Sequence, residues 1–458
     1  MTVTTVNPAT GAEIARYEST VDTDTVLDDA VASVRRRRRE PPSVREDRLR
    51  LMAARLRTGS PRFALAITTE MGKPLGQAHA EIEKCALACE YYADHIAELS
   101  APRPVHVAPD TGYVQILPLG VVLAVMPWNY PFWQVFRATI PAIALGGAVV
   151  LKHADNVTGS ALLVQELFDD VFGHGVLTTV VLPPERIGPL IDDPRIAAVA
   201  FTGSNRVGAL IGARAGAAAK KSVLELGGSD PFVVLADADV EAAARAAVRS
   251  RFLNTGQSCI AAKRLIVERP VRAEFVDHVL AELDGLVLGD PTAPATDLGP
   301  MARIDLRDEL RRQLDATLAD GARLLFGGRP DERPGAWFPP ALVEVDGGAS
   351  TAFTEETFGP LGALIAVSSA AEAIGVANDS RYGLSCSLWT RDIPRALALT
   401  TEIETGSVFV NRISESDPRL PVGGVKASGH GRELGRYGAL EFANIQTVRT
   451  SATTRETT

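Results

Sequence analysis

Cysteine is scarce in this chain: of 458 residues only four are cysteines, at Cys85, Cys89, Cys259 and Cys386. So few thiols exclude the disulfide framework of small secreted proteins. Cys85 and Cys89 lie four residues apart, a spacing that places both on one face of a helix. Such a pair could supply half of the ligands of a metal site. None of the seven histidines stands at a ligand spacing from them. We therefore expect both thiols to be buried and no metal to be bound.

Long apolar runs are lacking as well. A membrane-spanning helix needs about 18 to 20 apolar residues, and the best run here, LGVVLAVMPW, is far shorter and ends at Pro127. The first residues, MTVTTVNPATGAEIARYEST, contain no basic segment followed by an apolar one, so they do not form a secretory signal. These observations predict a soluble, cytoplasmic protein with no membrane partner.

Positive charge is in deficit, with 47 Lys and Arg against 56 Asp and Glu and a formal net charge of -9. This balance argues against nucleic acid or anionic lipid as a partner, because both attract basic surfaces. The exception is VRRRRRE, which contains Arg35 to Arg39 in a helix-like segment. We expect a solvated helical face there rather than a polyanion site.

The chain does contain a regular alternation of strand-like and helix-like segments. Apolar, β-branched runs recur at residues 120–126, 147–152, 176–182, 196–201 and 222–226. Strands separated by helical crossovers form a parallel sheet. A second series follows Cys259 and includes AKRLIVE and GSVFVNR. The pattern predicts an α/β protein with two lobes.

Ligands of such sheets bind at the carboxyl ends of the strands. Lys152 ends one strand, and Gly203 and Ser204 stand where another strand turns into a helix whose free amides attract phosphate. No G-x-G-x-x-G motif follows any strand. On these residues alone, nucleotide binding and a glycine needed only for a tight turn have comparable weight.

Four polar residues are placed for chemistry. Cys259 lies among small and polar residues in NTGQSCIAA, whereas a structural cysteine has large apolar neighbours. Asn129 in PWNYP presents an amide donor that an oxyanion can use. Glu225 in LELGGSDP ends a strand and is a candidate base, and Glu356 in EETFGP precedes a tight turn.

Together and in this order, the motifs resemble the NAD(P)-dependent aldehyde dehydrogenase superfamily. The resemblance runs from NPATG near the start, through LKHADN, FTGS and NTGQSC, to GGVKASGHGREL near the end. The segments LKHADNV, NTGQSCIAAKR, LGPMAR and FANIQTV look closest to the bacterial succinate-semialdehyde dehydrogenases. The small aldehyde substrate is therefore expected to carry a carboxylate.

The resemblance implies an aldehyde dehydrogenase-like fold: two parallel-sheet α/β lobes and a small β bridging element. We expect a Rossmann-like cofactor-binding domain from residues 1–101 and 120–226, and a catalytic domain from residues 227–430. Residues 102–119 and 431–458 would form the bridging element, whose strands pair between subunits in relatives. A homodimer or homotetramer is therefore expected.

The resemblance also assigns chemical roles. Cys259 matches the nucleophile that attacks the aldehyde carbon, giving a thiohemiacetal whose oxyanion is held by Asn129 and the Cys259 N–H. Hydride transfer to the cofactor then leaves a thioester. Glu225 matches the general base that activates the hydrolytic water.

Cofactor contacts follow in the same way. Glu356 matches the carboxylate that holds the nicotinamide ribose, Lys152 the contact to the adenosine ribose, and Ser204 the contact to the pyrophosphate. Without the resemblance, the residues alone favour Glu356 as a turn carboxylate and Lys152 as a surface cation. The remaining expected cofactor contacts are Trp128, Asp155, Gly203, Leu226 and Phe358.

Asp155 bears on the choice of cofactor. Its negative charge would repel the 2'-phosphate of NADP, so we expect NAD to be favoured and NADP to be tolerated. The neighbouring His153 is a possible source of positive charge for a phosphate.

Arg137 matches an arginine that binds the far carboxylate of succinate semialdehyde, a task that suits a guanidinium fork. The alternative is an ion pair on a helix flank. Some relatives carry a second arginine six residues before the nucleophile, where this chain has Leu253. A second anchor must come from elsewhere, with Arg412 and Ser414 as candidates, or the substrate is another small aldehyde.

Two other functions remain open. A CoA-acylating dehydrogenase would share the fold and the cysteine, but such relatives generally lack the glutamate that matches Glu225. A non-catalytic protein on the same scaffold is the other alternative, and the combination of Asn129, Glu225, Cys259 and Glu356 argues against it.

Overall fold

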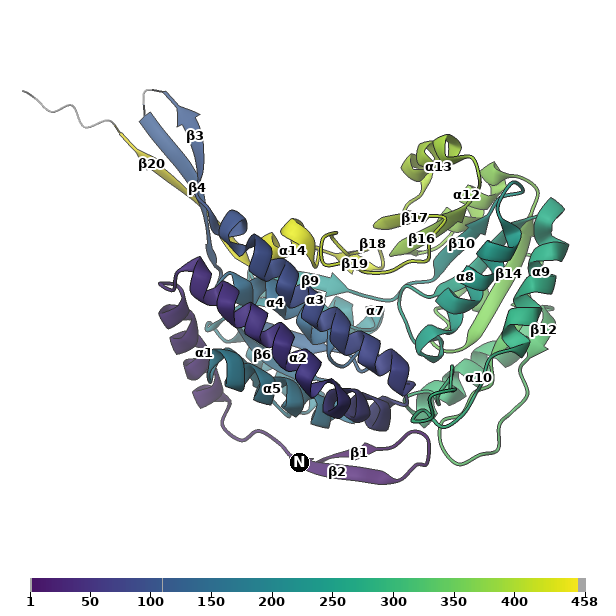
Figure 1. Cartoon of the computed structure of the whole chain (residues 1–458), viewed down its shortest axis with the longest axis horizontal. Coiled ribbons are helices and arrows are strands. Elements are labelled where there is room, and N and C mark those ends of the chain that lie inside the picture. The colour runs from purple at the N-terminus through teal and green to yellow at the C-terminus, as the bar shows by residue number, and fades with distance from the viewer. Residues whose placement is uncertain (1, 109, 452–458) are drawn as a thin grey trace, which may run out of the picture.

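The computed structural model describes residues 2–108 and 110–451 and consists of two lobes, each built on one large sheet (Figure 1). One sheet has six strands and the other seven. All but one strand at the edge of each sheet run parallel. The predicted α/β architecture with two lobes is therefore confirmed.

The six-stranded sheet has the order β19-β9-β8-β5-β6-β7. The five apolar runs of the sequence form its parallel strands, although the run at 176–182 pairs only over three residues at the edge of the sheet. The strands are β5 (Val121–Met126), β6 (Ala148–His153), β7 (Leu177–Thr179), β8 (Ile196–Thr202), β9 (Lys221–Glu225) and the antiparallel β19 (Gly429–His430).

Strand β5 explains why helices cover both faces of this sheet. Alternate side chains point to opposite faces, and here both sets are apolar. Val122 and Ala124 pack into one core, while Val121 and Leu123 pack into another. The first core is formed with the helices α2 (Pro42–Met71), α3 (Leu75–Ser100), α4 (Trp133–Ala144) and α5 (Thr158–Phe172). The second core is formed with α1 (Thr23–Arg37), α6 (Ile187–Asp192) and α7 (Asn205–Ala217) on the other face.

The seven-stranded sheet has the order β12-β13-β14-β11-β10-β16-β17. Its strands are β10 (Asp230–Val234), β11 (Ala262–Glu268), β12 (Arg323–Gly327), β13 (Ala341–Glu344), β14 (Leu361–Val367), β16 (Ser385–Trp389) and β17 (Ser407–Val410). Its helices are α8 (Val240–Phe252), α9 (Arg269–Asp284), α10 (Ile304–Ala319), α11 (Thr351–Thr354), α12 (Ala370–Asn378) and α13 (Ile393–Leu399).

The connection between the lobes sets the position of the site. Residues 226–229 lead from the carboxyl end of β9 directly to the amino end of β10. The carboxyl edge of the first sheet therefore faces the amino edge of the second. Within the first sheet, β5 lies between β6 and β8, so the strand order reverses beside β5. Sheets of this kind bind ligands at the carboxyl ends of the strands, next to such a reversal.

A three-stranded antiparallel sheet projects from the first lobe (Figure 1). It consists of β3 (Arg103–Val107), β4 (Asp110–Pro118) and β20 (Ala443–Thr450). The smaller elements are the pairs β1 (Thr2–Val6) with β2 (Glu13–Glu18) and β15 (Tyr382–Gly383) with β18 (Val425–Lys426), and the helix α14 (Gly435–Glu441). The predicted domain division remains a prediction, and residues 452–458 of the bridging element lie outside the described residues.

The arginine run was partly misread from the sequence. Arg35, Arg36, Arg38 and Arg39 are exposed at the end of α1, as expected, but Arg37 is buried. Its guanidinium donates to the carbonyl oxygens of Gly147 at 2.6 Å and Ile143 at 2.7 Å. It thereby ties α1 to two backbone carbonyls at and beyond the end of α4.

Two further expectations can be compared with the structure. Cys85 and Cys89 are buried in α3, as predicted. Among the described residues, no helix is long and apolar enough to cross a membrane. The cytoplasmic location stays a prediction.

Candidate active site

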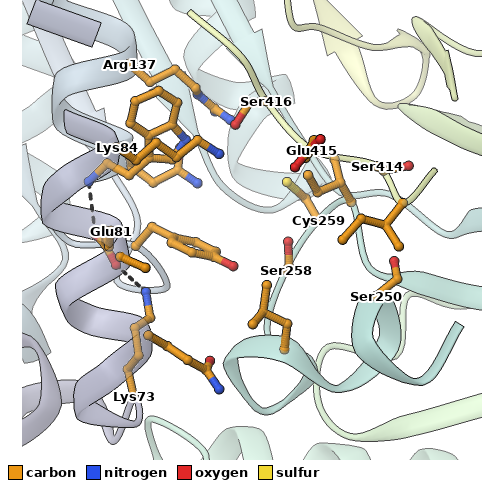
Figure 2. A pocket seen from close by; sticks show the side chains of 18 of the residues that line it. Lys73, Glu81, Lys84, Arg137, Ser250, Ser258, Cys259, Ser414, Glu415 and Ser416 are labelled. Atoms are coloured by element: carbon orange, nitrogen blue, oxygen red, sulfur yellow. Dashed lines mark hydrogen bonds and ion pairs between the residues drawn. The ribbon is translucent and has the colours of Figure 1, made fainter. Parts of the chain in front are cut away.

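A cavity of about 450 Å3 lies between the two lobes. Helices α3 and α4 form one wall, and the loop before β11 and the loop after β17 form the other. Figure 2 shows Lys84 and Arg137 on the helical wall, with Cys259 and Ser414 across from them. Cys259 is half-buried, whereas the other three cysteines are buried. The predicted nucleophile is thus the thiol that meets a ligand-sized space.

The loop that carries Cys259 has an unusual backbone. Asn254, Thr255 and Gly256 have φ angles of 56°, 54° and 70°, in the left-handed region. This conformation is costly for a β-branched residue and is held by surrounding contacts. The Asn254 amide donates to the carbonyl oxygen of Asn129 at 2.8 Å, and the buried Arg251 donates to that of Gly256 at 3.2 Å. The loop is therefore fixed to both lobes.

Asn129 lies just beyond the carboxyl end of β5. Its Nδ2 donates to the carbonyl oxygen of Gln257 at 3.1 Å, two residues before the nucleophile. Gln134 Nε2 donates to Asn129 Oδ1 at 3.4 Å and so orients the amide. The side chain is buried and does not itself line the cavity. An amide Nδ2 has two hydrogens, so one remains for an oxyanion.

Electrostatics keep the Cys259 thiol protonated at neutral pH. Burial raises the pKa of Cys259 to about 11, and the positive charges of Arg137 and Lys263 act in the opposite direction. The thiolate is the nucleophilic form. A base must therefore take the thiol proton before the attack.

Glu225 is the candidate for that base. It ends β9, is buried, and its Oε1 has no hydrogen-bond partner among the described residues. Burial raises the pKa of Glu225 above that of an ordinary carboxyl, the charge of Glu433 raises it further, and Arg137 opposes both. A carboxyl with a raised pKa suits proton transfer near neutral pH. Like Asn129, Glu225 does not itself line the cavity.

The predicted cofactor residues lie along the carboxyl edge of the six-stranded sheet. Lys152 Nζ contacts Asp155 Oδ1 at 2.6 Å, just after β6. Ser204 is the exposed N-cap of α7, and the Gly203 N–H donates to the carbonyl oxygen of Glu225 at 3.0 Å. The Leu226 N–H donates to the carbonyl oxygen of Ser428 at 3.0 Å. These residues border the crevice beside β5.

His153 does not supply positive charge, so that expectation was wrong. Its ring is buried, and burial lowers the pKa of His153 to about 4. Nε2 lies 2.8 Å from the carbonyl oxygen of Pro131, and Nδ1 accepts from the Ala154 N–H at 2.9 Å. Nε2 therefore carries the single proton of a neutral ring.

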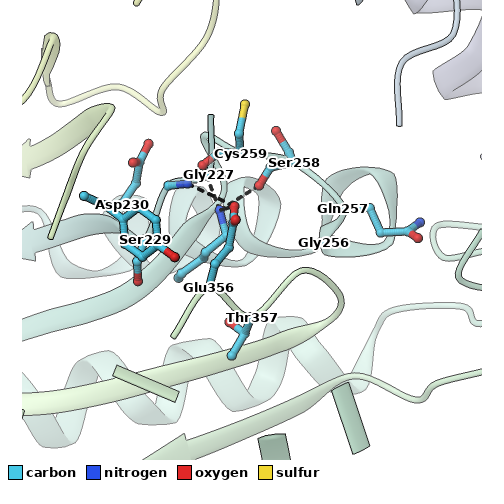
Figure 3. A network of polar contacts seen from close by, with 12 residues as sticks. Gly227, Ser229, Asp230, Gly256, Gln257, Ser258, Cys259, Glu356 and Thr357 are labelled. Carbon is cyan, nitrogen blue, oxygen red and sulfur yellow. Dashed lines mark hydrogen bonds and ion pairs between the residues drawn. The ribbon is translucent and has the colours of Figure 1, made fainter. Parts of the chain in front are cut away.

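Glu356 belongs to a network next to the nucleophile (Figure 3). Its Oε1 accepts from the Gly228 N–H at 3.0 Å and lies 3.4 Å from Lys263 Nζ. The same ammonium donates to the carbonyl oxygens of Ser258 at 2.8 Å and Cys259 at 2.7 Å. Glu356 is thus tied to the catalytic loop rather than free in a solvent-exposed turn.

Two aromatic residues predicted to contact the cofactor meet across the lobes. The rings of Trp128 and Phe358 lie edge to face, with centroids 5.7 Å apart. Both side chains are half-buried. They form an apolar contact between the end of β5 and the loop that carries Glu356.

The three predicted substrate residues differ in position. Arg137 is buried, lines the cavity and pairs with Glu433, while its Nη2 has no hydrogen-bond partner among the described residues. Ser414 lines the same cavity, and its Oγ lies 2.5 Å from Ser385 Oγ. Arg412 does not line it, because its exposed guanidinium pairs with Glu415.

The sequence interpretation missed four charged residues near the site. Lys73 and Lys84 project into the cavity wall from α3 or the turn before it, and Glu81 pairs with Lys73. Glu81 also accepts from the Phe132 N–H at 2.9 Å, at the start of α4. The fourth is Lys263. Charged residues inside apolar segments are rarely buried without a partner, which signals a partner for Glu81 and Lys263 without identifying it, but gives no signal for the half-buried Lys84.

Comparison with known proteins defines the class. The aldehyde dehydrogenase family matches residues 1–448. The chain is 45% identical over 446 residues to Sad of Escherichia coli K12, whose name is succinate semialdehyde dehydrogenase (NAD(P)+). The aligned residues make up 97% of this chain and 96% of that relative. It is 40% identical over 456 residues to the NADP+-named succinate-semialdehyde dehydrogenase 1 of Mycobacterium tuberculosis, covering 98% and 99%.

A solved structure agrees along the whole length. The crystal structure of the succinic semialdehyde dehydrogenase of Streptococcus pyogenes with NADP+ has a TM-score of 0.96 at 33% identity, covering 98% of this chain and 100% of that one. This chain therefore belongs to the aldehyde dehydrogenase family. Within that family it is an NAD(P)-dependent aldehyde dehydrogenase similar to the succinate-semialdehyde dehydrogenases.

Proposed function

We propose that this enzyme oxidises succinate semialdehyde to succinate. The observation that carries the proposal is the placement of Cys259 and Arg137 on opposite walls of one small cavity. A thiol at one end suits an aldehyde, and a guanidinium with a buried, unbonded Nη2 suits a carboxylate at the other. The substrate named for several relatives carries both groups.

In the first half of the proposed reaction, Glu225 takes the Cys259 proton and the thiolate attacks the aldehyde carbon. A carbon–sulfur bond forms, and the carbonyl oxygen becomes an oxyanion held by Asn129 Nδ2 and the Cys259 N–H. A bound nicotinamide dinucleotide supplies the hydride acceptor. As the carbon loses its hydride, the carbonyl re-forms and Cys259 carries a thioester.

In the second half, Glu225 first releases the Cys259 proton to solvent; water then attacks the thioester carbon, and Glu225 accepts a proton from that water. The carbon–sulfur bond breaks, the carboxylic acid leaves, and Cys259 regains its proton. One carboxyl can serve both half-reactions, because burial raises its pKa and so lets it accept and release protons near neutral pH. Glu225 does not line the cavity in this structure, so its action as the base requires a movement of its side chain.

The residues of the sheet edge fit a dinucleotide. The N-terminus of α7 presents the exposed Ser204 and free amides to a pyrophosphate. Lys152 and Asp155 would contact one ribose, and Glu356 the other. Trp128, Gly203, Leu226 and Phe358 would complete the walls.

We propose that NAD is favoured and NADP accepted. Asp155 neutralises Lys152 at 2.6 Å, and the neutral His153 adds no charge, so a 2'-phosphate meets little net attraction there. The ratio of kcat/KM for NAD to that for NADP should exceed one and should fall in Asp155→Ala. A wild-type preference for NADP, as named for some relatives, would refute this assignment.

The test of substrate and reaction is a kinetic panel. We expect succinate semialdehyde to have a much higher kcat/KM than butanal and the acid to form without CoA. Arg137→Ala should cost succinate semialdehyde about tenfold to hundredfold more than butanal, the value of a hydrogen bond to a charged group. Equal losses would mark a structural arginine, and a requirement for CoA would support the acylating alternative.

A further inference from the structure

We propose that Lys84 is a second anchor for the substrate carboxylate and a specificity-determining residue of this enzyme. The inference rests on the proposed function and deepens it, because it explains how the site binds a carboxylate without the second arginine that some relatives have. It assigns this role to α3, an element in which the sequence interpretation placed no substrate residue.

Lys84 has a suitable position for this role. Lys84 on α3 and Arg137 on α4 line the cavity that contains Cys259 (Figure 2). Lys84 Nζ lies 4.7 Å from the centroid of the Trp133 ring, which lines the same cavity. The aromatic face holds the ammonium in place without neutralising its charge.

Lys84 lacks an anionic partner in the part of the chain that the structure describes. Lys73, Lys152 and Lys263 each have a carboxylate within 4.0 Å. Among the described residues, no carboxylate lies within that distance of Lys84 Nζ, and no hydrogen bond of its ammonium exists. Its cationic charge is therefore available to a ligand.

Nearby carboxylates are already paired. The charges of Glu415 and Asp417 act on Lys84, but Glu415 pairs with Arg412 and Asp417 with Arg419. Neither partner arginine lines the cavity. These two carboxylates therefore contact other cations rather than the Lys84 ammonium.

A second cation, the guanidinium of Arg137, acts on Lys84. Burial lowers the pKa of Lys84 to about 8, and the charge of Arg137 contributes to that shift. Two cations that repel each other beside a cavity are stabilised by an anion that contacts both. A carboxylate has two oxygens, one for Arg137 Nη2 and one for Lys84 Nζ.

The experiment compares Lys84→Met, Lys84→Gln and Lys84→Arg with the wild type and with Lys221→Met. Lys221 is an exposed lysine on β9, outside the cavity, and serves as the matched control. The quantity measured is kcat/KM for succinate semialdehyde divided by that for butanal. Lys84→Gln, which keeps a polar side chain, takes the place of the Met variant if that variant fails to fold.

We expect the Met and Gln variants to lower this ratio about tenfold to hundredfold, mainly through the KM of succinate semialdehyde. Lys84→Arg should restore most of it, and Lys221→Met should leave it unchanged. Equal losses for both substrates, or no loss, would overturn the role of Lys84. If Arg137→Ala still lowers the ratio in that case, the proposed substrate stands and only Lys84 is excluded. A wild-type ratio near one would contradict the proposed substrate itself.

Discussion

At the scale of single residues, the proposed mechanism depends on polar groups at the ends of strands. Asn129 follows β5, Glu225 ends β9, and Cys259 precedes β11. Each takes its position from a buried strand, which fixes its backbone. Catalytic side chains on such rigid supports need little reorganisation during the reaction.

Asn129→Ala tests the oxyanion contact. Removing one such donor costs about 3 kcal/mol in the transition state, so kcat should fall between about 100-fold and 1000-fold. The measurement is steady-state kcat, with thermal unfolding as a control because the amide also bonds to Gln257. An unchanged kcat in a folded variant would remove Asn129 from the mechanism.

Glu225 should govern the pH dependence of turnover. Protonated Glu225 cannot act as a base, so kcat should be low at acid pH and rise as this carboxyl loses its proton. Because burial and Glu433 raise its pKa, the rise should lie well above the pH at which an exposed glutamate titrates.

Glu433→Gln removes a negative charge that raises this pKa and frees Arg137 to lower it. The rising limb of the kcat profile should therefore move to lower pH. A limb that stays in place would show that another group controls the profile.

The sequence identified the residues that carry motifs but not those that support them. Cys259, Asn129 and Glu356 stand in recognisable contexts at strand ends. Lys84 and Lys263 could not be assigned, because their roles depend on contacts between segments far apart in the chain, such as that of Lys263 with Glu356. Arg37 was misplaced for the same reason.

At the scale of elements, the predicted strands of the first sheet are confirmed because each is an apolar run buried on both faces. The loop at Asn254–Gly256 has no such pattern. Its left-handed backbone is held by tertiary contacts, including that of Asn254 with Asn129, and local propensity does not predict it.

Gly256→Ala tests how strongly that loop depends on glycine. Gly256 has φ of 70°, and an added Cβ would lie 2.4 Å from the Gly359 carbonyl oxygen. We expect a loss of about 1 to 3 kcal/mol in the free energy of unfolding, together with reduced activity. Chemical denaturation provides the measurement.

Gly216→Ala is the matched control for that substitution. Gly216 lies in α7, and an added Cβ would meet nothing within 4 Å. Alanine should leave stability unchanged or raise it slightly. If both variants behaved alike, the loop would not require glycine.

At the scale of the whole molecule, the projecting sheet is proposed to join subunits. Its edge strands β3 and β20 have free backbone groups on one side, and Val105 and Ile445 are 47% and 56% exposed. Ile445→Lys should weaken a homodimer or homotetramer, as measured by light scattering at several concentrations. A wild type that is monomeric throughout would exclude the proposed assembly.

The central claim is a covalent bond between Cys259 and the substrate carbon. Its most direct test is mass spectrometry of the wild-type enzyme, acid-quenched within the first turnover with succinate semialdehyde and NAD. We expect a succinyl group on Cys259, because the thioester forms before water hydrolyses it, and less of it in Glu225→Gln, which lacks the base for the thiol proton. An unmodified Cys259, or a succinyl group on another cysteine, would contradict it.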